Sequence, residues 1–175
     1  VFAATDNYPE YGAGEKRAGT WHIKIPTSEA FFEELETKIR GLRSQGVDVV
    51  IFSLHWGPNM VKVPPQHFKD FAHRLIDSGV DLIHGHSAHV FQGIEIYRSR
   101  IIFYDTGDFV DDYWVSEAID EQFIYLVRIE NKQFKEIELI PVKIDNYQVN
   151  LADGHTAQSA LERMQDRSAP FGVKI

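Results

Sequence analysis

The sequence contains no cysteine among its 175 residues. A chain without cysteine has no disulfide framework, no thiolate metal site and no cysteine nucleophile. Any metal site must therefore be built from His, Asp, Glu and Asn side chains. The eight histidines are a generous supply for such a site.

Positive charge and long apolar runs are also scarce. The chain has 18 Lys and Arg against 26 Asp and Glu, a formal net charge of -8. Clustered Lys and Arg are needed to bind nucleic acid or anionic lipid, so we expect neither partner. The longest apolar run, around Val49–Leu54, is far shorter than the roughly 20 residues of a membrane span. No basic-then-apolar signal segment opens the chain, and Val1 lies within a predicted strand, so we expect sequence upstream of it.

The length suits one domain, and a hydrophobic fraction of 43% is enough to fill a core. The first half of the chain alternates predicted strands with predicted helices, which indicates parallel strands joined by right-handed crossovers. The helix periodicity is clear in Phe31, Leu35, Ile39 and Leu42, which share one face. The predicted elements are strands at Val1–Thr5, Val47–His55 and Val80–His84, helices at Ser28–Gln45 and Gln66–Ser78, a loop at Asp6–Gly19 and a short strand at Trp21–Ile25.

The second half is rich in strands with short connections. The predicted elements are strands at Gly93–Tyr97, Ile101–Tyr104, Phe123–Glu130, Phe134–Ile144 and Tyr147–Leu151, and a helix at Thr156–Asp166. Asn131-Lys132-Gln133 predicts a hairpin turn. The fold class is therefore α/β, a single layered domain in three parts: residues 1–92, 93–151, and 152–175 with the terminal helix and tail.

Three histidines follow two buried strands. His86 and His89 lie in Gly85-His86-Ser87-Ala88-His89, and His55 ends the preceding long strand. Ligands of open α/β sheets bind outside the carboxyl ends of strands. If the two strands are neighbours, three imidazoles meet there and form a divalent-metal site with room for water or substrate. The alternative is that each histidine is a hydrogen-bonded residue of the core or rim, which is the commoner role of one histidine at a strand end.

An acidic loop follows the strand that ends near Tyr104. Asp108 lies directly after Gly107 and is the carboxylate that we favour as functional, either orienting a metal-bound histidine or binding the ion. Asp111 and Asp112 are expected to be solvated. We interpret Asp6-Asn7 as an ordinary turn, although both are metal-ligand types. The remaining histidines are not expected to be ligands: His22, His67, His73, His84 and His155.

At these residues the chain resembles the bacterial capsule-synthesis proteins of the poly-γ-glutamate type, the CapA-like family of the calcineurin-like metallophosphoesterase superfamily. The resemblance covers roughly residues 1–130, and His-Trp-Gly with Gly-His-x-x-His is its most specific combination. The matching segments are Thr5-Asp6-Asn7, His55-Trp56-Gly57, Pro65-Gln66, Leu75–Ile83, Gly85–Val90, Gln92–Glu95 and Tyr104–Phe109. Two departures are Ser87-Ala88, where the family commonly has His-Pro, and Asp108, where it often has Asn.

The resemblance implies a layered αββα fold and a two-metal phosphoester hydrolase site, with Mn, Fe or Zn as the ion. His55, His86 and His89 would be ligands and catalytic groups, and Asp108 would act beside them or on the phosphate side. The superfamily's Gly-Asp strand end and Asn-His pair are not found in residues 1–175. We therefore expect the chain to correspond to the C-terminal half of the family's domain, with an incomplete metal site.

Three functional hypotheses remain open. The first is a metal-dependent hydrolase acting on a phosphoester. The second is a non-catalytic factor for assembly or export of an anionic polymer such as poly-γ-glutamate. The third is an inert half-domain that associates with its missing N-terminal half or with itself through an exposed sheet edge. Only the resemblance indicates a location, which would be extracytoplasmic or associated with the cell envelope.

Overall fold

A computed structural model describes residues 1–110 and 120–175. Its first layer is a five-stranded sheet, here called sheet A, in the order β1-β2-β3-β5-β4. The first four strands in this order are parallel, and β4 is antiparallel to β5. The strands are β1 (Phe2–Thr5), β2 (Ile51–His55), β3 (Leu82–His86), β4 (Ile94–Tyr97) and β5 (Arg100–Phe103).

Two helices cover one face of sheet A. Helices α1 (Glu29–Ser44) and α2 (Gln66–Asp77) connect the parallel strands, as expected for βαβ crossovers. Alternate residues of the central strands point into this layer, because side chains along a strand alternate between faces. The core between helices and sheet includes Leu35 of α1, Leu75 of α2, and Phe52, Ile83 and Ile102 of the sheet.

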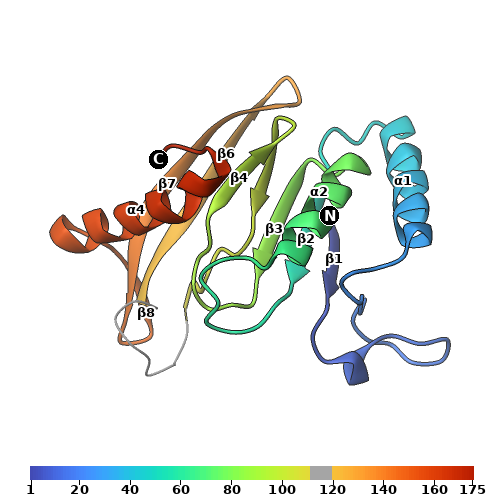
Figure 1. The fold of residues 1–175 in the computed structure, drawn as a ribbon, viewed down its shortest axis with the longest axis horizontal. Coiled ribbons are helices and arrows are strands. Elements are labelled where there is room, and N and C mark those ends of the chain that lie inside the picture. Colours follow the sequence, from blue (N-terminus) through green and yellow to red (C-terminus); the bar gives the residue numbers. More distant parts are fainter. Residues whose placement is uncertain (111–119) are drawn as a thin grey trace.

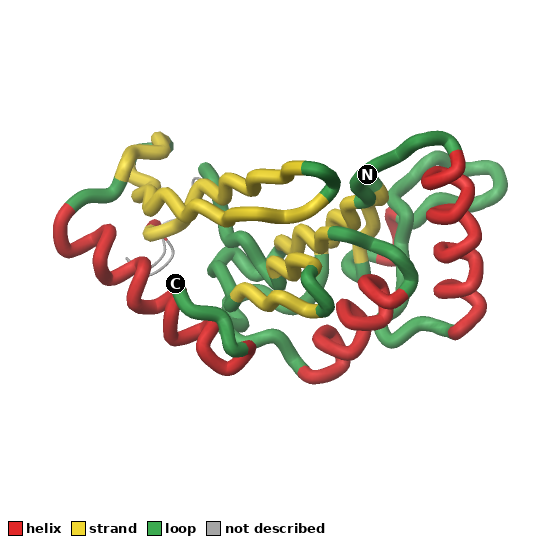
Figure 2. The backbone as a smooth tube through the Cα atoms, turned by 90° about the horizontal axis from the view of Figure 1, so that it is seen from above, coloured by secondary structure: helices red, strands yellow, loops and turns green. Residues whose placement is uncertain are grey.

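A three-stranded antiparallel sheet, here called sheet B, packs on the other face of sheet A. Its strands are β6 (Glu121–Glu130), β7 (Gln133–Asp145) and β8 (Gln148–Leu151), in that order. Helix α4 (Gly154–Ser168) contacts β4, β6 and β7, and Figure 2 shows it running along one side of the molecule. A second core includes Leu82, Ile101 and Phe103 of sheet A, Phe123 of sheet B and Met164 of α4.

Short 3-10 turns complete the described elements: η1 (Pro9–Tyr11) and η2 (Ala169–Phe171). The two connections of sheet B are tight turns. Asn131 and Lys132 link β6 to β7, Asn146 and Tyr147 link β7 to β8, and all four have positive φ. Two successive residues of positive φ are typical of the type I′ hairpin turn, whose twist suits antiparallel strands. This confirms the predicted hairpin at Asn131-Lys132.

The structure confirms the α/β class and the change from parallel strands to a strand-rich second half (Figure 1). This arrangement is compatible with the layered fold that the resemblance implies. The predicted strand at Trp21–Ile25 is wrong, because only His22 forms a bridge, to Thr5. The strand predicted at Val80–His84 lies two residues later, at Leu82–His86. Asp81 stays outside it, since its carboxylate accepts a hydrogen bond from Val50 N–H just before the strand begins. Asp111 and Asp112 lie outside the described residues.

Among the helices that the structure describes, none is long and apolar enough to cross a bilayer.

Candidate functional site

The candidate site lies at the carboxyl ends of β2 and β3, on the face of sheet A opposite α1 and α2. His55 and His86 are direct partners in the parallel register of these two strands. Both are half-buried, whereas the residues that alternate with them point into the helix-covered core. A hollow of about 510 Å³ opens beside them, and Thr5, Asn7 and Trp21 contribute to its lining. Two predicted site residues are thus placed side by side.

The imidazole rings of His55 and His86 have centroids 5.6 Å apart at an interplanar angle of 67°. The Nδ1 atom of His55 lies 3.0 Å from the Thr5 hydroxyl at the end of β1. A neutral imidazole that donates its Nδ1–H to this hydroxyl keeps a lone pair on Nε2. Thr5 therefore can orient His55 in the way that outer partners orient metal-ligating histidines.

His86 has the environment of a neutral imidazole. Burial, reinforced by the neighbouring His84 and His55, lowers the pKa of His86 to about 4. Its Nδ1 atom is buried and has no hydrogen-bond partner within residues 1–110 and 120–175. Buried polar atoms without a protein partner are uncommon, and a bound ion or water is one way in which such an atom is satisfied. The neutral form is also the one that binds a cation.

His84 joins this cluster although it is not a predicted ligand. It is two residues before His86 on β3, so the two side chains share a face, and their centroids are 5.0 Å apart. Its Nδ1 lies 3.1 Å from Ser53 Oγ and its Nε2 lies 3.2 Å from Thr106 Oγ1. Both ring nitrogens therefore have hydroxyl partners. This supports a role for His84 as a hydrogen-bonded wall of the site, and burial lowers its pKa.

The third predicted histidine, His89, is paired with the predicted carboxylate. His89 Nδ1 lies 3.0 Å from Asp108 Oδ1 and 3.1 Å from Asp108 Oδ2. Such a carboxylate contact fixes the ring orientation and tautomer of a histidine. The structure therefore brings Asp108 to His89, as an orienting group would require.

The His-Trp-Gly and Gly-His segments fit each other physically. The indole Nε1–H of Trp56 crosses over Gly85 and donates to the carbonyl oxygen of Tyr104, 2.8 Å away. A methyl group at Gly85 would overlap both that carbonyl and the indole nitrogen. Glycine is therefore required before His86, because only a residue without a side chain leaves room for the Trp56 indole to reach the Tyr104 carbonyl across β3.

Asp6 and Asn7, interpreted from the sequence as an ordinary turn, lie beside the site. Asp6 Oδ1 accepts a hydrogen bond from Gly57 N–H at 3.1 Å, and burial raises the pKa of Asp6. The Asn7 amide reaches Ser87 Oγ at 3.2 Å and lies 3.4 Å from His55 Nδ1. Their position directly after β1, at the same edge of the sheet as His55 and His86, is the sequence feature that could have identified them as site residues.

No group of three or more His, Asp or Glu side chains in residues 1–110 and 120–175 is arranged to hold a metal ion. The described site is thus a pair of adjacent imidazoles, His55 and His86, and a separate His89–Asp108 pair. The donor types suit a borderline divalent ion. The ion's full ligand set is not gathered by the described residues.

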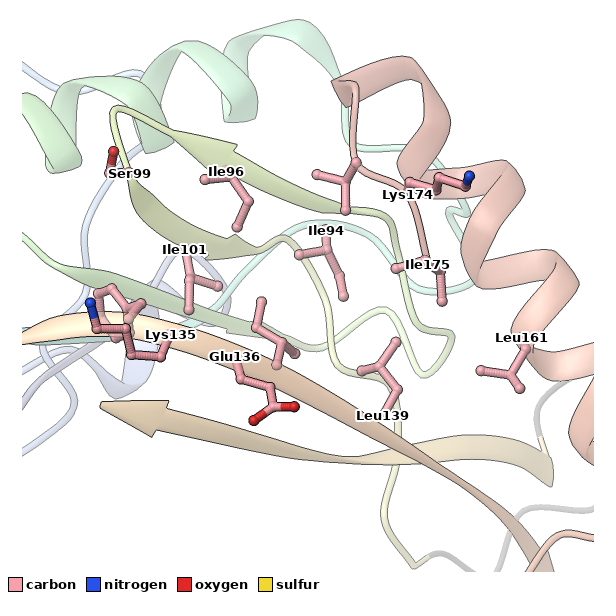
Figure 3. Close-up of a pocket in the computed structure, with 13 residues that line it drawn as sticks. Ile94, Ile96, Ser99, Ile101, Lys135, Glu136, Leu139, Leu161, Lys174 and Ile175 are labelled. Carbon is pink, nitrogen blue, oxygen red and sulfur yellow. The ribbon is translucent and has the colours of Figure 1, made fainter. Parts of the chain in front are cut away.

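A second hollow lies away from the histidines (Figure 3). Its volume is about 550 Å³, and it is bounded by β4, β5, β7, α4 and the last residues of the chain. Isoleucine and leucine side chains from these elements point toward it, among them Ile94, Ile101 and Leu139. None of the predicted site residues lines it.

The sequence also matches a known protein family. The model of the family described as bacterial capsule synthesis protein PGA_cap matches residues 1–113. The chain belongs to this family. The matched region of this PGA_cap chain contains every predicted site residue: His55, His86, His89 and Asp108.

Relatives support the same assignment. A probable polyglutamine synthesis accessory protein of Mycobacterium tuberculosis is 30% identical over 186 residues, covering 100% of this chain and 48% of that protein. The PGA biosynthesis protein CapA of Bacillus subtilis is 30% identical over 97 residues, covering 55% and 25%. The capsule biosynthesis protein CapA of Bacillus anthracis is 27% identical over 108 residues, covering 62% and 26%. The PGA_cap chain thus spans about half the length of the first of these relatives.

Proposed function

We propose that this PGA_cap chain supplies histidine ligands to a divalent-metal site that acts on a phosphoester during synthesis of a capsule or poly-γ-glutamate-type polymer. The observation that carries the proposal is the register pairing of His55 with His86 at adjacent parallel strand ends. Supporting it, the buried Nδ1 of His86 has no partner among the described residues. Mn, Fe and Zn all suit such imidazole and carboxylate donors.

The roles of the residues follow from their contacts. His55 and His86 would hold the ion, with Thr5 orienting His55 through Nδ1. His89 would be the third ligand, oriented by Asp108. A bound divalent cation supplies positive charge that neutralises the charge developing on a phosphoryl group. Because the described residues do not gather three ligands, the proposal includes further ligands from outside residues 1–110 and 120–175.

The test is the metal content and phosphodiesterase activity of the full-length protein. We expect bound Mn, Fe or Zn and hydrolysis of bis-p-nitrophenyl phosphate, both lost when His86→Ala is combined with His89→Ala. His155→Ala is the matched control, because His155 is an exposed histidine of α4. Unchanged metal content and activity in the double variant would contradict the proposal.

The second candidate is a non-catalytic factor in polymer assembly or export. It is supported by the Mycobacterium tuberculosis relative, which is named as a probable synthesis accessory protein. The net charge of -8 opposes binding of an anionic polymer, so this candidate requires a metal bridge or a local basic groove. Binding of poly-γ-glutamate that persists in a chelator, measured by co-sedimentation, would support this candidate over the hydrolase. Binding that the chelator abolishes would support a metal bridge.

A further inference from the structure

Asp105 is a buried carboxylate that connects two loops of the site. It is 2% exposed and comes directly after Tyr104, at the end of β5. Its Oδ2 accepts the backbone N–H of Ala88 and its Oδ1 accepts the backbone N–H of Gly107, both at 2.8 Å. One oxygen therefore binds the loop of His86 and His89, and the other binds the loop that carries Asp108.

The histidine loop has a backbone that needs such support. Ser87 has φ of 130° and His89 has φ of 61°, and Ala88 lies between them. Side-chain-bearing residues adopt positive φ at a free-energy cost, and they keep it only where surrounding contacts hold it. The contact from Asp105 to Ala88 N–H falls at the centre of this strained segment.

A carboxylate is well suited to this place. Two oxygens that only accept can each bind one amide N–H. The side-chain amide of asparagine has one accepting oxygen and one donating NH₂, so one backbone N–H would face a donor. Burial raises the pKa of Asp105 to about 6, while the two amide contacts oppose that rise. The contacts therefore favour the ionised acceptor against the cost of burying it.

We propose that Asp105 is the positioning residue of the site: its two carboxylate oxygens fix the His86–His89 loop and the Asp108 loop relative to each other. This inference rests on the proposed function, because fixing the two loops affects metal binding only if His86 and His89 are ligands. The two carboxylate oxygens of Asp105 accept the backbone N–H groups of Ala88 and Gly107, so Asp105 positions the two loops through their backbone.

Asp81 provides a matched control. It is also 2% exposed, and its Oδ2 accepts Val50 N–H at 2.7 Å. It pairs with Arg43 and Arg100 at the start of β3, the end away from the histidines. Asp81→Asn thus disturbs a buried carboxylate and lowers stability without reaching the site loops.

The experiment compares Asp105→Asn with Asp81→Asn in the full-length protein. Mn²⁺ affinity is measured by calorimetry, and backbone amide exchange is followed in residues 86–89 and 105–108. Loss of an outer partner of a metal site typically weakens metal affinity about 10–100-fold, and we expect that loss for Asp105→Asn, with faster exchange in both loops. Asp81→Asn should lower the melting temperature and leave Mn²⁺ affinity unchanged.

Unchanged Mn²⁺ affinity and unchanged exchange in Asp105→Asn would overturn the inference, as would an equal affinity loss in Asp81→Asn. If the unmodified protein binds no Mn²⁺, the proposed function fails, and amide exchange alone decides the role of Asp105: faster exchange in both loops supports it and unchanged exchange overturns it. If Asp105→Asn does not fold, Asp105→Glu replaces it. Its carboxylate is one methylene further out and cannot hold both amides in place.

Discussion

At the scale of single residues, His86 stands apart because its surroundings oppose its charge. The folded-state pKa of about 4 lies below the ordinary value of 6.5. As pH falls from 6.5 towards 4, the unfolded chain takes up a proton at this histidine before the folded chain does. The contribution of His86 to stability is therefore fully present above pH 6.5 and is lost as pH falls through this window.

We expect His86→Asn to remove that part of the pH dependence. Urea unfolding at pH 7 and at pH 4.5 should show a smaller fall in the free energy of unfolding for His86→Asn than for the unmodified protein. His155→Asn, at an exposed position, should keep the full fall. An identical fall in His86→Asn would contradict the interpretation of His86 as a histidine held neutral by burial.

Gly85 gives a second prediction at this scale. A methyl group at this position would overlap the Tyr104 carbonyl and the Trp56 indole nitrogen. Overpacking of this kind costs about 1–3 kcal/mol or more, and Gly85→Ala should lower the free energy of unfolding by that order. Gly14→Ala is the control, since no atom lies within 4 Å of its added methyl. Equal stability of the two variants in chemical denaturation would refute the argument.

Part of the site could be predicted from the identities and positions of its residues. His55 and His86 were predicted to meet because each ends a buried strand, and the register confirms it. The contact of Asp108 with His89 links two loops whose paths the sequence does not determine. Asp105 was not predicted, because its role depends on two backbone amides, and hydrogen-bond partners of that kind leave no pattern in the sequence.

At the scale of elements, the site depends on three strands being held in line. Trp56 leaves the end of β2 and reaches past β3 to the Tyr104 carbonyl that follows β5. This single indole contact ties the strand ends that carry His55, His86 and the Asp108 loop. Loss of the indole N–H should therefore loosen the strand ends as well as lower stability.

We expect Trp56→Phe to lower the free energy of unfolding by about 1–3 kcal/mol, because the buried Tyr104 carbonyl would lose its donor. Trp21→Phe is the control, since Trp21 is 39% exposed. Thermal unfolding followed by circular dichroism would measure both. A loss in Trp21→Phe as large as that in Trp56→Phe would show that aromatic packing, not the hydrogen bond, accounts for the effect.

The elements were well predicted where their periodicity was strong. The helix over Ser28–Gln45 is α1 at Glu29–Ser44, and the strand over Phe134–Ile144 is β7 at Gln133–Asp145. The segment Trp21–Ile25 alternates like a strand, yet it has only a single bridge. Its alternation reflects packing of Trp21 against Phe52 and Phe31, which a sequence pattern cannot distinguish from strand pairing.

At the scale of the molecule, sheet A contributes side chains to two hydrophobic cores, one on each of its faces. Ile83 and Ile102 face the α1 and α2 side, while Leu82 and Ile101, their neighbours in sequence, face sheet B and α4. A side chain lost from either core weakens the same sheet. We therefore expect the described parts to unfold together and not layer by layer.

Leu75→Ala and Met164→Ala test this coupling from opposite sides, since both side chains are fully buried. Each should lower the free energy of unfolding by about 2–5 kcal/mol. In both variants, urea unfolding monitored by tryptophan fluorescence and by far-ultraviolet circular dichroism should show one coincident transition. Separate midpoints for the two probes in Met164→Ala would show that sheet B and α4 unfold independently.

The tight turns of sheet B have a consequence for the order of folding. Strands β6, β7 and β8 are joined by two-residue turns, so closing them costs little chain entropy. Pairing β1 with β2, by contrast, joins residues fifty positions apart, such as Thr5 and His55. Contacts between distant residues form more slowly. The strand ends that carry the histidines are thus expected to assemble late, around a hairpin that is already in place.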